Sequence, residues 1–331
     1  MRSFAFSSPV TVGLYGERYA ASAAILSLLA LGIGPGDSVI VPPLTFFATA
    51  GTVARLGARP VFADIDPRTC NISPGCVEAA LADPLNAGRV KAIIPVHLYG
   101  QCADMDTLGA LARKHELHVI EDAAQAILAT HRGRPAGSMG AAGCFSFYPT
   151  KNLGGAGDGG LITVRDSALA ERLRMLRNHG SLDRITYPEV GLNSRLDTLQ
   201  AAILLVKMKH IRAWTAARRE RAAEYRRLFS EIFSDAGRWD AAAAYPTDNA
   251  PVILPHEALP GEHVYHQFTV RVLRRSDLMA HLKSQGIETT VYYPVALHQQ
   301  PAFKPSSADA ASCPEAARAA SEVLSLPMYP R

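Results

Sequence analysis

Short, almost continuous apolar runs rich in β-branched and aromatic residues recur through the first half of this 331-residue chain. Strands buried on one face alternate apolar and polar residues, whereas continuous apolar runs are typical of strands buried on both faces. Helical patterns separate several of the runs, and such alternation predicts an α/β domain around a mostly parallel sheet. The expected strands are 39–41, 60–62, 92–96, 118–121, 144–147 and 161–164, and the expected helices between them are 46–56, 76–82 and 105–115.

A long helical pattern and a second, smaller α/β pattern fill the rest of the chain. Apolar residues at helical spacing predict one connecting helix over about 196–233. We expect a large domain over residues 1–208 and a small C-terminal domain over 209–331, as a chain of this length allows. The small domain is expected to contain a strand over 265–273, a helix over 276–285 and a strand over 289–293.

The long helical stretch is also basic, which raises the question of a nucleic-acid partner. Glu220 and Glu224 interrupt the basic face, no aromatic residues are interleaved with its charges, and the formal net charge of the chain is only +4. This pattern favours a solvated helix face over a nucleic-acid stripe, so we expect no nucleic-acid partner. The basic residues are Lys207, Lys209, Arg212, Arg218, Arg219, Arg221, Arg226 and Arg227.

Composition and cysteine usage indicate a soluble cytoplasmic protein. Apolar residues make up 48% of the chain and charged residues 19%, which is ordinary for a globular protein. The most apolar stretch, Ala20–Ile33, is shorter than the roughly 20 residues that span a membrane, so we expect a buried helix there and no membrane partner. No signal-peptide pattern is present at the N-terminus. The five cysteines contain no CxxC pair and are odd in number, which favours a reducing cytoplasm over a disulfide framework.

A lysine in a glycine-bordered turn is the first candidate for chemistry. Lys151 lies within Phe145–Gly160, between two expected strands. A Walker phosphate loop needs glycines before its lysine, whereas here they follow it. Gly155, Gly157 and Gly160 have GxGxxG spacing, but a dinucleotide-binding fingerprint opens a helix and this one precedes a strand. The remaining interpretation is a desolvated lysine, whose lowered pKa favours the neutral amine that a Schiff base requires.

Asp122 is the second candidate, because it directly follows the expected strand 118–121. In open α/β sheets, ligands bind at the carboxyl ends of the strands. A carboxylate at such a place is costly unless it is paired, and the protonated pyridine nitrogen of a pyridoxal cofactor is a suitable partner. A helix N-cap before Ala123 explains the same residue equally well.

Other catalytic motifs are missing from the chain. His115 and His118 do not have the HExxH spacing of a zinc protease, and no GxSxG hydrolase elbow occurs. We therefore expect no metal site.

Further motifs stand in a fixed order on both sides of Asp122 and Lys151. Together they closely resemble the DegT/StrS-type family of sugar aminotransferases, over nearly the whole chain from about residue 28. The resemblance implies pyridoxal-phosphate fold type I, similar to aspartate aminotransferase, with a large mostly parallel domain and a smaller C-terminal α/β domain. The motifs are Gly32–Asp37, Pro42–Thr49, Pro95–Gly100, Val119–Ala126, Asn178–Gly180, Gly191–Ala202 and Tyr292–His298.

The resemblance also implies a role for each matching residue. Lys151 would be the Schiff-base lysine of pyridoxal 5'-phosphate, and Asp122 would keep the pyridine nitrogen protonated. Gln125 would lie near the ring and Phe46 would stack on it. The cofactor phosphate would be contacted by Ser146, by Ser22 and, from the neighbouring subunit, by Asn193, while Tyr293 and His298 would approach the sugar.

The implied activity is transfer of an amino group from glutamate to a nucleotide-linked keto sugar, by a homodimer with shared active sites. Relatives that dehydrate sugars resemble this group but carry histidine in place of the lysine, so Lys151 favours transamination. Two alternatives stay open. One is a pyridoxal-phosphate enzyme acting on a non-sugar ketone or amine, and the other is a catalytically degenerate homologue with a regulatory or structural role.

One segment departs from the family pattern. The family has a Ser-Gly-Thr turn at a helix start, where backbone amides and the helix dipole hold the cofactor phosphate. The matching region here, Tyr15–Ile25, is shorter and keeps only Ser22 as a remnant of that turn. Losing part of this turn should weaken cofactor retention, and three outcomes stay open: Ser146, Asn193 and Ser22 suffice to hold the phosphate, the cofactor binds loosely, or the activity has drifted.

Overall fold

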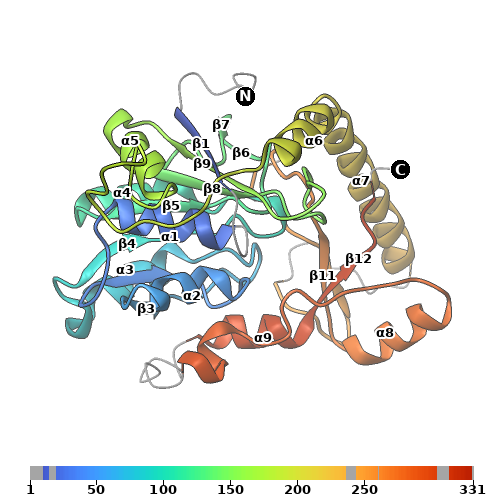
Figure 1. Ribbon diagram of the computed structural model, residues 1–331. Coiled ribbons are helices and arrows are strands. Elements are labelled where there is room, and N and C mark those ends of the chain that lie inside the picture. The colour runs from blue at the N-terminus through green and yellow to red at the C-terminus, as the bar shows by residue number, and fades with distance from the viewer. Residues whose placement is uncertain (1–9, 15–19, 236–243, 260, 304–312, 330–331) are drawn as a thin grey trace.

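A seven-stranded sheet in the order β1-β9-β8-β5-β4-β2-β3 organises the larger part of the computed structural model, which describes residues 10–14, 20–235, 244–259, 261–303 and 313–329 (Figure 1). The neighbours β8, β5, β4, β2 and β3 run parallel, while β9 is antiparallel to β8 and to β1. The predicted mostly parallel sheet is thus confirmed. The strands are β1 (Val10–Leu14), β2 (Ser38–Val41), β3 (Arg59–Phe62), β4 (Val90–Ile93), β5 (His118–Asp122), β8 (Ala142–Ser146) and β9 (Gly160–Val164).

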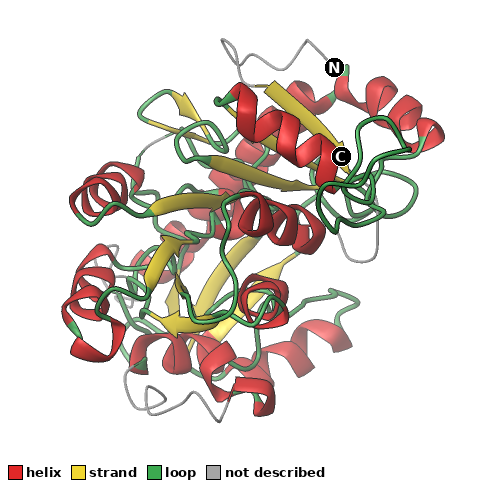
Figure 2. Cartoon of the chain, turned by 60° about the vertical axis from the view of Figure 1, so that its left-hand side comes forward, coloured by secondary structure: helices red, strands yellow, loops and turns green. Residues whose placement is uncertain are grey.

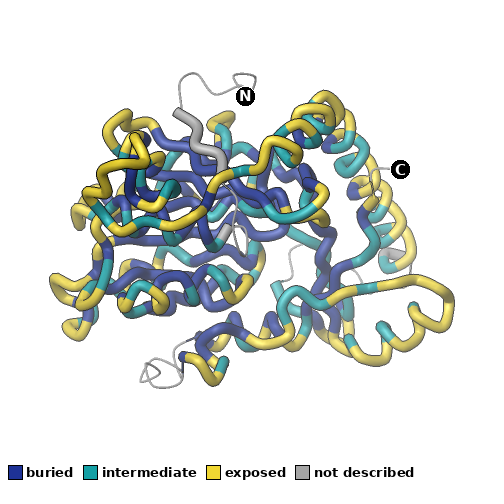
Figure 3. The backbone as a smooth tube through the Cα atoms, in the orientation of Figure 1, coloured by how far each residue is buried: buried dark blue, intermediate teal, exposed yellow. Residues whose placement is uncertain are grey.

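Helices cover both faces of this sheet, which explains the continuous apolar runs (Figure 2). Val39 and Val41 of β2 enter one hydrophobic core with α1 (Ala20–Ala30), α2 (Ala48–Arg55) and α5 (Ser167–Leu176). Ile40, between them, enters a second core with α3 (Pro74–Ala82) and α4 (Met105–Lys114). Because successive side chains of a strand point to opposite faces, both faces need apolar residues. The strands are accordingly buried beneath exposed outer loops (Figure 3).

A smaller antiparallel sheet, β10 (Val252–Ile253), β11 (Phe268–Val272) and β12 (Val323–Leu326), follows near the C-terminus. Helices α8 (Arg275–Ser284) and α9 (Pro314–Glu322) accompany it. The expected strand 289–293 is wrong, since only Thr290 forms a bridge, with Ser325. That bridge lies on the outer edge of β12, where Thr290 and Ser325 exchange backbone hydrogen bonds, and the chain then leaves the sheet and lines a pocket with Val291, Tyr292 and Tyr293. Short elements complete the fold: η1 (Pro84–Asn86), η2 (Leu98–Gly100), β6 (Thr130–His131), β7 (Arg134–Pro135) and η3 (Leu297–Gln299).

The expected continuous helix over 196–233 is also wrong, because the structure has two helices, α6 (Thr198–Met208) and α7 (Ile211–Asp235). At the end of α6, the backbone N–H groups of Lys209 and His210 donate to carbonyls three residues earlier. This tighter pattern ends the α-helical ladder. Lys207 of α6 donates to the Gly154 carbonyl, whereas α7 packs on the small sheet. The two helices therefore have different packing partners.

Part of the basic face of α7 is not solvated as expected. The Arg218 guanidinium donates through one nitrogen to the carbonyls of Tyr265, His266 and Met328 at 3.0–3.3 Å. Arg219 donates to the His263 carbonyl at 2.9 Å. These arginines therefore hold α7 against the small sheet. No helix in the described part of the chain is long and apolar enough to span a membrane.

One carboxylate joins the two sheets. Asp64, just after β3, accepts hydrogen bonds from the backbone N–H groups of Glu315 (2.8 Å) and Ala316 (2.9 Å) in the first turn of α9. The residue before that helix, Cys313, provides no side-chain cap of its own. Asp64 thus satisfies two N–H groups that would otherwise have no partner within the helix.

Replacing Asp64 with alanine should lower the free energy of unfolding by about 1–2 kcal/mol, the range for losing a helix cap. The measurement is urea unfolding, with proteolysis of α9 as a local readout. Asp166→Ala is a matched control, because Asp166 caps α5 within its own segment at the surface. Both variants should lose stability, but only Asp64→Ala should expose α9 to protease. Equal protease resistance in the two variants would contradict the inter-sheet role.

Candidate active site

A cavity of about 630 Å³ opens at the carboxyl ends of β4, β5 and β8. This is the edge of a parallel sheet where α/β proteins bind ligands. The segments before β11 and after Thr290 close its other side, so both sheets contribute to one pocket. The lining residues are Ala21, Thr45, Phe46, Ala48, Val96, Asp122, Ala124, Gln125, Ser146, Tyr148, Thr150, Lys151, His266, Gln267, Val291, Tyr292 and Tyr293.

Asp122 is the last residue of β5, and its carboxylate is held at the cavity wall. The Thr49 hydroxyl donates to Oδ2 at 3.0 Å, and the Ala124 backbone N–H donates to Oδ1 at 3.2 Å. Burial raises the pKa of Asp122, although these two hydrogen bonds oppose the rise. No helix follows β5, since the next element is β6, so Asp122 does not act as the helix cap considered above.

Lys151 lies in the turn that follows β8. Burial lowers the pKa of its amine to about 8, and the charge of Asp122 opposes that shift. The amine makes no hydrogen bond to any residue that the structure describes. The adjacent glycines are needed sterically, because a Cβ on Gly154 would collide with the Pro149 carbonyl. A partly neutral amine beside a carboxylate can act both as nucleophile and as proton carrier.

Gln125 and Tyr293 connect the floor of the pocket to its outer wall. The Gln125 amide accepts from the Tyr99 backbone N–H at 2.6 Å and donates to the Tyr293 hydroxyl at 3.2 Å. Burial is the main cause that raises the pKa of Tyr293, so this hydroxyl stays protonated. Phe46 is 50% exposed, and its ring centroid lies 6.2 Å from that of Tyr293. Such an exposed ring at a pocket wall is available for stacking.

Most of the expected site residues line the pocket, whereas Ser22, Asn193 and His298 are not among its lining residues. Ser146 lines the pocket, and its hydroxyl accepts from the Tyr148 backbone N–H at 3.3 Å. Ser22 is buried in α1, next to the lining residue Ala21. Asn193 lies on the surface, and His298 packs against Phe62, with ring centroids 6.2 Å apart, outside the pocket lining. Residues 15–19, which carry the expected shortened turn, lie outside the described residues.

Comparison with known proteins assigns the chain to a family. The profile of the DegT/DnrJ/EryC1/StrS aminotransferase family matches residues 19–331. The chain belongs to this family. Its resemblance to the DegT/StrS-type enzymes is therefore confirmed, and it is a pyridoxal-phosphate-dependent aminotransferase.

Two curated relatives and one crystal structure illustrate the similarity. A pleiotropic regulatory protein of Geobacillus stearothermophilus is 50% identical over 92% of this chain and 77% of its own length. A UDP-N-acetyl-3-dehydro-alpha-D-glucosamine 3-aminotransferase of Acidithiobacillus ferrooxidans is 44% identical over 93% and 77%. The crystal structure of DesV from S. venezuelae, in complex with a ketimine intermediate, is 42% identical, with a TM-score of 0.85 over 97% of this chain and 80% of DesV.

The pocket of this DegT/DnrJ/EryC1/StrS member fits the family's cofactor. A buried carboxylate and an amine with lowered pKa lie on the same cavity of about 630 Å³, with an exposed aromatic ring at its wall. The Asp122 carboxylate has two described hydrogen-bond donors, the Thr49 hydroxyl and the Ala124 N–H. A carboxylate can accept more bonds than two, so Asp122 can also accept one from a protonated ring nitrogen. An amine without a hydrogen bond is free to form a covalent link with an aldehyde. The residues present therefore suit pyridoxal phosphate.

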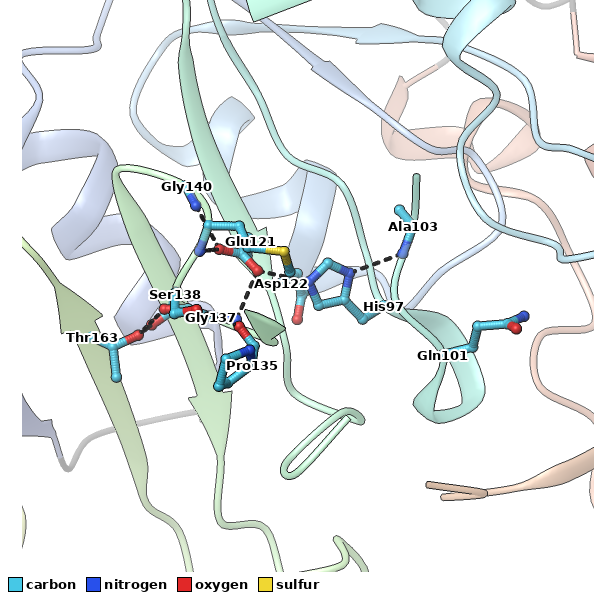
Figure 4. A network of polar contacts seen from close by, with 12 residues as sticks. His97, Gln101, Ala103, Glu121, Asp122, Pro135, Gly137, Ser138, Gly140 and Thr163 are labelled. Atoms are coloured by element: carbon cyan, nitrogen blue, oxygen red, sulfur yellow. Dashed lines mark hydrogen bonds and ion pairs between the residues drawn. The ribbon is translucent and has the colours of Figure 1, made fainter. Parts of the chain in front are cut away.

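Sequence reasoning missed a buried network directly behind the pocket (Figure 4). Glu121, which precedes Asp122, accepts hydrogen bonds from the backbone N–H groups of Gly137, Met139 and Gly140 at 2.6–2.7 Å. His97 Nε2 lies 2.9 Å from the same carboxylate, and the Ala103 N–H donates to its Nδ1 at 3.2 Å. His97 therefore donates through Nε2. The apolar strand pattern ending in two adjacent acids, Glu121 and Asp122, was the available signal.

The lowered pKa of Lys151 predicts an unusual pH dependence for its reaction with amine reagents. Only the neutral amine reacts, so labelling of Lys151 should rise with a midpoint near pH 8, whereas the ordinary value for lysine is 10.5. Asp122→Asn removes a charge that raises this pKa, so the midpoint should fall further. Reductive methylation mapped by mass spectrometry measures the profile, with Nα-acetyl-lysine as control. A Lys151 profile matching that of the control would contradict the assignment.

Proposed function

We propose that this aminotransferase converts a nucleotide-linked keto sugar to an amino sugar, with glutamate as the amino donor. The observation that carries the proposal is the placement of Lys151 and Asp122 on one cavity. The 44% identical relative, which is named as a UDP-sugar aminotransferase, supports the substrate class. The cavity of about 630 Å³ can enclose a cofactor together with part of a substrate.

Each residue has a separate task in the proposed reaction. Bound pyridoxal phosphate supplies an electron sink for the carbon that carries the amino group. Asp122 holds a proton at the ring nitrogen, and its raised pKa suits a shared proton. Lys151 acts first as a base, which removes a proton from the α-carbon of the donor, and then as an acid, which gives that proton to a second carbon. An amine with a pKa of about 8 can do both near neutral pH.

The remaining site residues would hold the cofactor and the sugar in place. We assign Phe46 to stacking on the ring and Gln125 to the region of the ring hydroxyl. Ser146 and Ser22 would bind the phosphate. Tyr293 would face the sugar, and His298, which lies behind Phe62, would act on the substrate only indirectly. We further propose that residues 1–208 form the cofactor-binding domain and residues 209–331 the domain that closes over the substrate.

The active unit is proposed to be a homodimer, in which Asn193 reaches the phosphate in the neighbouring subunit. Asn193 is exposed and lies in a stretch of chain, residues 182–206, that carries many exposed apolar side chains, and apolar side chains left in water favour a partner. Val190 is 93% exposed and Ile185 83% exposed, which is unfavourable for apolar side chains in water. The other large exposed apolar residues in this stretch of the chain are Leu182, Tyr187, Leu192, Leu199, Leu205 and Val206.

A cytoplasmic location is proposed from the cysteines. None of the five, all of which lie in the described part of the chain, forms a disulfide. This is the usual state of thiols in a reducing compartment.

A regulatory role is the second candidate, because the 50% identical relative is named as a pleiotropic regulatory protein. A regulator would have no need for an amine with lowered pKa beside a buried carboxylate, since both groups cost folding free energy. A folded protein that binds pyridoxal phosphate but transfers no amino group from any donor would support this candidate over catalysis.

Lys151→Ala should abolish transamination and the yellow, borohydride-fixable band of the loaded protein. Asp122→Asn should reduce turnover by about 10²-fold or more, as expected for loss of a group that controls protonation. Turnover of UDP- and dTDP-linked keto sugars with glutamate is the measurement. Lys91→Ala, at an exposed position of β4, is the matched control and should be fully active. Activity retained in Lys151→Ala would overturn the proposed mechanism.

Complementation tests the shared site. If Asn193 serves the neighbouring subunit, Lys151→Ala and Asn193→Ala chains should each be inactive or impaired alone. Mixed dimers then contain one site with both defects and one intact site, so a refolded equimolar mixture should regain about a quarter of wild-type turnover. A mixture no more active than its separate components would show that Asn193 does not act across subunits.

A further inference from the structure

A short segment, residues 264–267, leads into β11 of the small sheet and is anchored to η2, which follows β4 of the large sheet. The Val264 N–H donates to the Gly100 carbonyl at 2.9 Å, and the Gln267 N–H donates to the Tyr99 carbonyl at 3.3 Å. Gly100 has a φ of +103°, and a Cβ there would lie 2.9 Å from the His266 backbone nitrogen. The contact therefore requires glycine, and it fixes the backbone of the segment at the pocket wall.

His266 holds the centre of this segment against the residue that follows Lys151. The Asn152 amide donates to the Val264 carbonyl at 3.4 Å, so its oxygen is the acceptor for His266 Nδ1, 3.0 Å away. Burial, and then the charge of Lys151, hold the pKa of His266 well below its usual range, so the imidazole is neutral. The segment thus has a defined position relative to Lys151.

Gln267 is the residue of this segment whose side-chain oxygen has no described hydrogen-bond partner. It lines the pocket and is only 9% exposed, yet its Oε1 has no hydrogen-bond partner among the residues that the structure describes. Gln125, on the same pocket, has both ends of its amide bonded within the protein. A buried amide oxygen without a partner costs folding free energy, and a bound ligand that supplies the partner is one explanation for such an atom at a pocket wall.

We propose that Gln267 determines acceptor specificity by hydrogen bonding a hydroxyl next to the keto carbon of the sugar, an inference that rests on the function proposed above. A primary amide is neutral and carries both donors and an acceptor, as a hydroxyl does. Gln267 lines the same pocket as Lys151, and its segment is anchored to Asn152, the residue that follows Lys151. A carboxylate of the amino donor would instead call for a cationic partner.

The test compares Gln267→Leu with Gln101→Leu. Gln101 is an equally buried glutamine outside the pocket, and its amide bonds the His256 carbonyl and the Ala258 N–H. Gln267→Leu should lower kcat/KM for the hydroxyl-bearing acceptor about tenfold, the size of one neutral hydrogen bond, while kcat/KM for the analogue lacking that hydroxyl is unchanged. The half-reaction with glutamate should also be unchanged.

Two readouts do not depend on turnover. In a Lys151→Ala background, calorimetric affinity for the same nucleotide-linked acceptor should fall about tenfold with Gln267→Leu and stay unchanged with Gln101→Leu. The melting temperature should show the reverse pattern. Gln101→Leu leaves two backbone groups without partners and should melt lower, whereas Gln267→Leu removes an unsatisfied oxygen and should melt at the same temperature or higher.

The outcomes separate the two proposals. A wild-type protein that neither binds nor converts nucleotide-linked sugars overturns the proposed function and this inference with it. Wild-type turnover together with unchanged acceptor selectivity in Gln267→Leu overturns this inference alone. A Gln267→Leu variant that loses affinity for pyridoxal phosphate, with unaltered acceptor binding in the Lys151→Ala background, assigns the amide to the cofactor and likewise overturns it.

Discussion

Two adjacent carboxylates at the end of β5 support the architecture of the site. Because successive side chains of a strand point to opposite faces, Glu121 and Asp122 serve different purposes. Glu121 is fully buried, and three backbone N–H groups together with His97 satisfy it, so it fastens the 137–140 turn behind the pocket. Asp122 faces the cavity with only the Thr49 hydroxyl and the Ala124 N–H as described donors. Glu121, whose hydrogen bonds are all made within the protein, thus positions Asp122, which can still accept a hydrogen bond from a ligand.

The pocket exists only because the two sheets meet. β5 and β8 bring Asp122 and Lys151 to one edge of the large sheet, whereas the segments 264–267 and 291–293 come from beside the small sheet. This arrangement is held through backbone groups: Asp64 accepts from the first turn of α9, and the N–H groups of Val264 and Gln267 donate to the carbonyls of Gly100 and Tyr99. Since such contacts do not depend on which sugar is bound, the same frame can serve relatives with different substrates.

Sequence patterns predicted the large sheet well and the small one less well. Strands such as β2 and β3 are buried on both faces, so their apolar runs stand out. The segment 289–293 has strand-like composition, yet it pairs with β12 only at Thr290 and then turns to line the pocket, and composition cannot show how far a segment stays paired. The sequence did not predict the boundary between α6 and α7, because no glycine or proline lies there. The two helices are distinguished only by their different packing partners.

By itself, the sequence determined the α/β class and most of the order of strands and helices, and it supplied the proposal that Lys151 and Asp122 form the chemical pair. These follow from local periodicity and from ordered motifs, which need no knowledge of distant contacts. Only the tertiary structure decided that Glu121 is buried in a hydrogen-bond network while Asp122 lines the cavity, that His298 lies outside the pocket lining, and that Gln267 Oε1 has no partner among the described residues. Those facts depend on which residues far apart in the chain become neighbours, and burial and hydrogen bonding are properties of that arrangement alone.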